Sequence, residues 1–165
     1  MLNAYHGNKK VVIVNINDNA IAHDLEKVLA ANNFNNVVSF SAPKSYPGYF
    51  KVAEAEGVYT IFVEESKSCK VQPCLVEGFT GKRLGQQVRR DLTESQKAKD
   101  LFKHHLKMLG MDPNLLGSYK IDFEEVKDIP WFYTDETPML YVTVPNVEGV
   151  ADAICNSIKD YFVSK

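Results

Sequence analysis

Polar side chains that could do chemistry follow three predicted strands, at the point where each strand ends. In open α/β sheets, ligands bind beyond the carboxyl ends of the strands, where the strand order reverses. The polar residues at these ends are Asn15, Asn17, Asp18, Glu64, Glu65, Thr143 and Asn146. The carboxylates among them could bind a cation, act as a general base or cap helices. Because no histidine is evident nearby, helix capping is the favoured interpretation.

A second candidate is the segment Thr80-Gly81-Lys82-Arg83, which precedes a predicted helix. Free backbone N–H groups at a helix start, together with two cations, can bind phosphate. The segment lacks the glycine spacing of a P-loop, however. The alternative, which we favour, is that Lys82 and Arg83 belong with Arg89 and Arg90 to the solvated face of that helix.

The cysteines and histidines do not form a recognisable metal or nucleophile motif. Cys69 and Cys74 are separated by more residues than most zinc ligand pairs, and no second pair follows them. His104 and His105 are adjacent on a predicted helix, where neighbouring side chains point about 100° apart. There is also no Gly-x-Ser-x-Gly sequence. We therefore predict no metal site and no cofactor.

The elements that must position these residues alternate between strand and helix. Strands are predicted at 9–16, 36–40, 58–63, 74–76 and 119–123, and helices at 20–31, 49–56, 82–92 and 93–109. Residues 137–165 are predicted to form a buried strand, a turn and a closing amphipathic helix. Residues 64–73 are predicted to be a loop, and Asp112-Pro113 to open a short helical turn. Strand–helix–strand order is typical of a parallel sheet with right-handed crossovers. We predict one three-layer α/β/α domain spanning residues 1–165, with a largely parallel central sheet and an inserted helical segment at 93–116.

Composition sets broad limits on the class of protein. The chain of 165 residues has a hydrophobic content of 45%, which is ordinary for a globular protein. Its net charge of −2 provides no positive potential that would attract nucleic acid. No apolar run is long enough to span a bilayer, and residues 1–10 lack the apolar region of a signal peptide. We expect a soluble cytoplasmic protein in which residues 1–8 can be a disordered tail.

Several segments are similar in order and hydrophobic pattern to one enzyme family. They are KVVIVNI (10–16), IAHDLEKVLAANNF (21–34), NVVSF (36–40), YFKVAEAEGVYTIFVEESKS (49–68), GKRLGQQVRRDL (81–92) and ETPMLYVTVPNVEGVADAICNSIKDYF (136–162). Together these segments resemble the zinc-dependent N-acetylmuramoyl-L-alanine amidases, which cleave peptidoglycan.

The resemblance also implies which residues should do the chemistry, and the chain departs from that pattern. The family binds zinc through two histidines and a glutamate, and a further glutamate in the final strand acts as the general base. Here Glu64 and Glu65 occupy the place of the second histidine, and Thr143 lies near that of the catalytic glutamate. The first strand runs through residues 15–19 directly into a helix, so the loop carrying the first ligand is missing. The resemblance therefore implies a degenerate, non-catalytic domain.

Three functions remain open. The first is a non-catalytic amidase-like module that binds a small molecule or glycan, or a protein partner, at the strand ends. The second is a hydrolase or transferase for a phosphorylated or nucleotide substrate, using Asp18, Glu64 or Glu65 with Lys82 or Arg83. The third is a structural or assembly protein, either homo-oligomeric or bound to another chain. For this third function, residues 130–133, around the only tryptophan, Trp131, would form an interface. The alternative, which we favour for this segment, is a loop whose aromatic side chains pack onto the core.

Overall fold

Six strands and four helices make up the part of the chain that the structure describes. This computed structural model describes residues 9–45, 52, 55, 57–77, 93–126 and 137–163. The strands are β1 (Val11–Ile16), β2 (Val37–Ala42), β3 (Tyr59–Glu65), β4 (Lys70–Glu77), β5 (Tyr119–Asp122) and β6 (Met139–Val144). The helices are α2 (Ala20–Ala31), α4 (Thr93–Met108), α5 (Phe123–Val126) and α7 (Val150–Val163).

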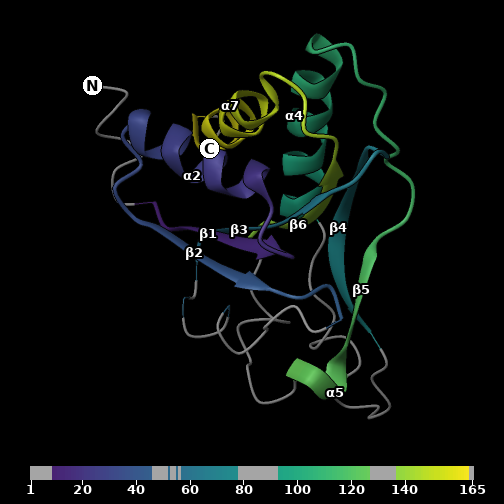
Figure 1. Ribbon diagram of the computed structural model, residues 1–165. Coiled ribbons are helices and arrows are strands. Elements are labelled where there is room, and N and C mark those ends of the chain that lie inside the picture. Colours follow the sequence, from purple (N-terminus) through teal and green to yellow (C-terminus); the bar gives the residue numbers. More distant parts are fainter. Residues whose placement is uncertain are drawn as a thin grey trace.

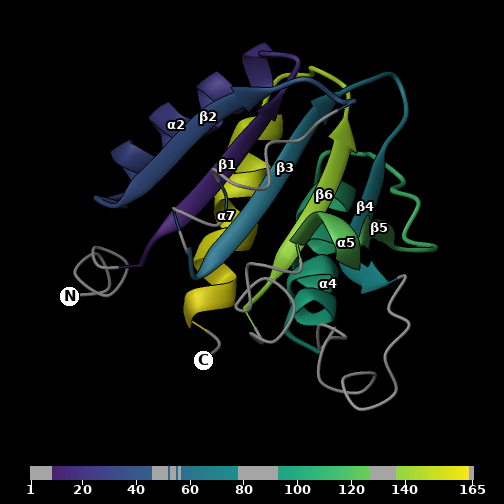
Figure 2. The same ribbon diagram turned by 90° about the horizontal axis from the view of Figure 1, so that it is seen from below.

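The strands form one sheet in the order β2-β1-β3-β6-β4-β5 (Figure 2). The first four of these strands are mutually parallel. β4 runs antiparallel to β6, and β5 runs parallel to β4. β1 and β6 are buried along their whole length, as expected for strands covered on both faces. The predicted α/β class with a largely parallel central sheet is confirmed.

Apolar side chains alternate along the inner strands and form a separate core on each face of the sheet. On one face, Ile13, Ile61 and Val142 belong to a core that includes residues of α2, α4 and α7, and these three helices lie together on that side (Figure 1). On the other face, strand residues pack with Val52, Ala55 and α5. This arrangement agrees with the predicted three layers. None of the described helices has the length and apolar character needed to cross a membrane.

Helix α2 begins and ends where the sequence predicts. The side chain of Asn19 accepts a hydrogen bond from the backbone N–H of Ala22, which makes it the N-cap. At the other end, Asn33 adopts a positive φ of 68°. Asn tolerates this left-handed conformation better than most residues do, so the helix stops there.

Helix α4 is tied to its neighbours by polar contacts at both ends, so it forms part of the helical layer over the sheet. Tyr161 Oη of α7 donates to Glu94 Oε1 at 2.6 Å. Ser95 Oγ exchanges hydrogen bonds with the backbone of Met139 in β6. Near the other end, His105 Nε2 lies 2.6 Å from Asp160 Oδ2.

Two local predictions were wrong. The loop predicted at 64–73 is too long, because β4 already begins at Lys70. Pro73 pairs with Leu140 of β6, and the next residue, Cys74, pairs with Tyr119 of β5, so β4 changes its partner strand at this point. A strand tolerates a residue without a backbone N–H at such a position. The helical turn predicted at Asp112-Pro113 is also absent, because Asn114 instead forms an isolated bridge with Lys70.

Other predictions fall outside the described residues. These are the tail at 1–8, most of the helix at 49–56, the helix at 82–92 with Lys82 and Arg83, and the Trp131 segment.

Candidate functional site

A pocket lies at the carboxyl ends of β1 and β3, the point where the chain connections diverge. From β1 the chain continues to β2 on one side, and from β3 it continues to β4 on the other. The pocket has a volume of about 380 Å³ and is lined by Ile16, Asn17, Asp18, Asn19, Ala20, Glu64 and Glu65. It is thus at the topological switch point, where open α/β sheets bind ligands. Four of the nine residues predicted from the sequence come together here: Asn17, Asp18, Glu64 and Glu65.

Two buried asparagines fix the loop between β1 and α2 beneath this pocket. Asn15 Oδ1 accepts from the backbone N–H of Asn19 at 2.6 Å, and Asn15 Nδ2 donates to the Asn19 carbonyl. Asn19 Nδ2 donates in turn to the carbonyls of Ile16 and Val63, at 3.0 and 2.8 Å. Asn15 is therefore used in holding the loop against β3, and it does not line the pocket itself.

The loop places Asn17 and Asp18 in a sparsely populated backbone conformation. Their φ angles are 58° and 53°, in the left-handed region that costs most residues about 1–2 kcal/mol each. Asn17 Oδ1 accepts from the backbone N–H of Lys44 at 3.2 Å, and its own N–H donates to Ala42. Asn and Asp tolerate this conformation better than most residues do, and these contacts, with the asparagine network below, hold Asn17 and Asp18 in place at the mouth of the pocket.

Asp18 bridges two side chains that the sequence does not place beside it. His23 Nε2 lies 2.7 Å from Asp18 Oδ1, and Ser41 Oγ donates to the same oxygen at 3.1 Å. These hydrogen bonds, first that of His23 and then that of Ser41, hold the pKa of Asp18 below its usual value. The premise that no histidine is near the strand-end carboxylates was therefore wrong. The carboxylate lies between the imidazole and the hydroxyl, whereas in a hydrolase triad the histidine takes that position.

Glu64 is the most enclosed carboxylate of the site. Its side chain is 13% exposed, and Oε2 lies 2.9 Å from Lys44 Nζ. Its other oxygen accepts from Tyr141 Oη at 2.7 Å. Burial and the hydrogen bond to Glu64 raise the pKa of Tyr141, so the phenol stays protonated and acts as a donor. Glu65, the next residue, is exposed and adds a further carboxylate to the lining of the pocket.

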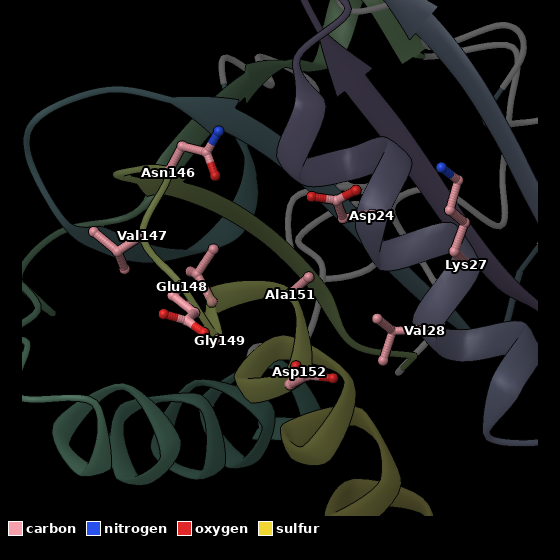
Figure 3. Close-up of a pocket in the computed structure, with 10 residues that line it drawn as sticks. Asp24, Lys27, Val28, Asn146, Val147, Glu148, Gly149, Ala151 and Asp152 are labelled. Atoms are coloured by element: carbon pink, nitrogen blue, oxygen red, sulfur yellow. The ribbon is translucent and has the colours of Figure 1, made fainter.

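The last two strand-end residues lie elsewhere. Thr143 is buried and is the register partner of Glu64 across β3 and β6. Asn146 lines a different pocket, of about 420 Å³, between α2 and the turn that leads into α7. Figure 3 shows this second pocket, with Asp24, Lys27 and Val28 of α2 on one side and the segment 146–152 on the other. Asn146 therefore does not lie with Asn17, Asp18, Glu64 and Glu65, because the turn after β6 leads this residue toward α2.

His23, Ser41, Lys44 and Tyr141 complete the site, and the sequence interpretation did not include them. His23 could have been anticipated, because it stands one helical turn after the cap Asn19 and so faces back toward the preceding loop. Ser41 and Lys44 carried a weaker signal, since Ser41 lies near the end of the strand next to β1 and Lys44 follows that strand. Tyr141 carried none, because only the pairing of β3 with β6 brings it to Glu64.

The site is chemically an acceptor-rich surface. Its lining carries the carboxylates of Asp18, Glu64 and Glu65, and the neighbouring cations are Lys44 and, when protonated, His23. Within the described ranges, no three His, Cys, Asp or Glu side chains are grouped so as to hold a metal ion. Neither a scan against protein-family models nor a search of curated proteins finds a match to the chain.

Proposed function

We propose that this domain is a non-catalytic binding module for a small glycan or a similar ligand rich in hydrogen-bond donors. The observation that carries the proposal is the pocket at the switch point of β1 and β3, whose lining presents Asn17, Asp18, Glu64 and Glu65. Carboxylates are acceptors only, and each can receive two or more hydrogen bonds. Hydroxyl and ammonium groups are the complementary donors.

The existing hydrogen bonds leave part of this lining available. Both carboxylate oxygens of Glu64 already accept hydrogen bonds, from Lys44 and Tyr141. Glu64 therefore shapes the pocket more than it binds a ligand. Asp18 uses one oxygen for two partners and is 67% exposed. With exposed Glu65, it is the group best placed to receive donors from a ligand.

The negative charge of the pocket also discriminates between the alternatives. A phosphorylated or nucleotide substrate would be repelled by the carboxylates of Asp18, Glu64 and Glu65, because a pocket lined mainly by charges of one sign disfavours a ligand of the same sign. Lys44 offsets only part of that charge and is itself paired with Glu64. The geometry therefore favours a neutral or cationic ligand, while the resemblance to cell-wall amidases stays a prediction that favours a glycan.

The test is a binding screen with four probes: glucosamine, glucose, glucose 6-phosphate and ATP. A ligand present at about 100 times its Kd adds about 2.7 kcal/mol to the free energy of unfolding. For a chain of this size, that gain corresponds to a rise in Tm of about 5–10 °C. We expect the rise with glucosamine, a smaller one with glucose, and none with the two phosphorylated probes.

Two matched variants assign the binding to the pocket. Glu65→Gln removes one exposed charge from the lining, and Glu26→Gln removes one from the exposed surface of α2. We expect Glu65→Gln to weaken glucosamine binding several-fold in isothermal titration calorimetry and Glu26→Gln to leave it unchanged. The proposal fails if no probe binds, if the phosphorylated probes bind best, or if the two variants behave alike.

A further inference from the structure

The outer edge of β2 carries backbone hydrogen-bonding groups that nothing in the described structure uses. The carbonyls of Asn36 and Ala42 accept from Val11 N and Asn17 N of the β1 side, at 3.0 and 2.8 Å. The direction of the backbone N–H and C=O groups alternates from one residue to the next along a strand. In β2, these groups of the even-numbered residues therefore point toward β1. The N–H and C=O groups of Val37, Ser39 and Ser41 therefore point outward, and the views of the sheet show β2 as its outermost strand (Figure 2).

The two edges of this sheet differ in how they are protected. Natural sheets block unwanted edge pairing with short strands, charged side chains, prolines and bulges. β5, at one edge, spans only Tyr119–Asp122. It also carries a charged residue, Lys120, whose Nζ lies 3.9 Å from Glu77 Oε1. β2, at the other, has six residues, Val-Val-Ser-Phe-Ser-Ala, without a charge or a proline. The edge of β2 therefore lacks every one of these protective devices.

We propose that β2 is a self-association edge, at which two copies of this chain join their sheets through antiparallel pairing of β2 about a two-fold axis at Ser39. Two-fold pairing requires that one surface be complementary to itself. The outward groups meet this requirement, because residues 37, 39 and 41 are symmetric about 39. Ser39 then faces Ser39 of the partner subunit, and Val37 faces Ser41 of the partner subunit, each pair exchanging N–H···O bonds.

Side-chain pairing in this register is favourable on both faces of the joined sheet. Val38 and Phe40 are half-buried and pack against the core opposite α2. In the proposed register, Val38 stands directly across from Phe40 of the partner subunit, an aromatic and β-branched pair of the kind that stabilises sheets. On the α2 face, the two Ser39 hydroxyls meet at the axis. No like charges oppose one another, because β2 contains none.

The first experiment removes one outward N–H and measures association by sedimentation velocity up to several hundred micromolar. Ser39→Pro deletes a donor that faces away from β1, so the β1 ladder keeps all its bonds, and an edge strand tolerates proline in this orientation. Ser39→Ala retains the N–H and is the matched control. We expect a dimer for the wild type and for Ser39→Ala, and at least about a tenfold weaker dimer for Ser39→Pro.

A second experiment tests the axis itself and does not depend on the folding of the proline variant. Ser39→Glu and Ser39→Lys each place like charges opposite one another at the axis, so each alone should be monomeric, whereas their mixture should form a heterodimer. Asn156→Glu, an exposed change on α7, controls for added charge and should remain dimeric. A wild-type monomer at all concentrations, a dimer that Ser39→Pro and Ser39→Glu leave intact, or no heterodimer in the mixture would each overturn the proposal.

Discussion

Removing the side chain of Asn19 should be among the most damaging single changes at the carboxyl ends of the strands, because this side chain links β1, α2 and β3. Asn19→Ala deletes the N-cap bond to Ala22, a loss of about 1 kcal/mol. It also deletes the donors to the carbonyls of Ile16 and Val63, which are buried at 1% and 0% exposure. Each of these bonds contributes about 1 kcal/mol. The expected loss is therefore about 3 kcal/mol in the free energy of unfolding.

A serine at the same position separates the two contributions. Asn19→Ser keeps an oxygen able to cap the helix but cannot reach both carbonyls, so it should lose about 2 kcal/mol. Asn156→Ala, an exposed change on α7, should lie within about 0.5 kcal/mol of the wild type. The assay is urea denaturation followed by far-UV circular dichroism. A loss below about 1 kcal/mol for Asn19→Ala, or equal losses for Ala and Ser, would refute the role assigned to the side chain.

Further predictions concern single groups. Tyr141→Phe leaves Glu64 Oε1 without its donor and should cost about 1.5–3 kcal/mol by urea denaturation, and an unchanged stability would show that the bond is unimportant. In an NMR titration, Asp18 should ionise below its usual pKa of 3.8, and His23→Ala should raise the midpoint. Since the folded-state pKa is depressed, the stabilisation is present above about pH 4 and is lost as the pH falls through the lowered pKa. Burial raises the pKa of Cys155 to about 11, so iodoacetamide at pH 8 should modify it only after unfolding. Finally, the purified protein should hold no stoichiometric zinc and release no stem peptide from peptidoglycan; finding both would identify an active amidase.

Hydrophobic pattern and caps were enough to predict most of the fold. The apolar run before Asn17 and the asparagines on either side of α2 are local signals, and the strand and helix they predict are present. The fourth strand was predicted too short, because Pro73 suggests a loop and only the change of partner at that residue permits a strand. Which strands pair with one another over long distances along the chain cannot be predicted from local patterns in a single sequence.

The sequence brought together some of the residues that line the pocket at the ends of β1 and β3, but it did not indicate their partners. The rule for strand ends selected Asn17, Asp18, Glu64 and Glu65, and these residues share one pocket. The same rule could not show that Asn15 would be used up in loop bonding, or that Asn146 would turn toward α2. Partners such as Lys44 come from another strand end, and their side-chain direction depends on packing.

The most direct test of the proposed function is an NMR titration of the isotopically labelled protein with glucosamine. Saturable shifts at the backbone amides of Asn17, Asp18, Glu64 and Glu65, weakened several-fold by Glu65→Gln and unaffected by Glu26→Gln, are the expected result. Absence of shifts at these four amides, or shifts confined to the second pocket around residues 146–152, would contradict a ligand site at the ends of β1 and β3.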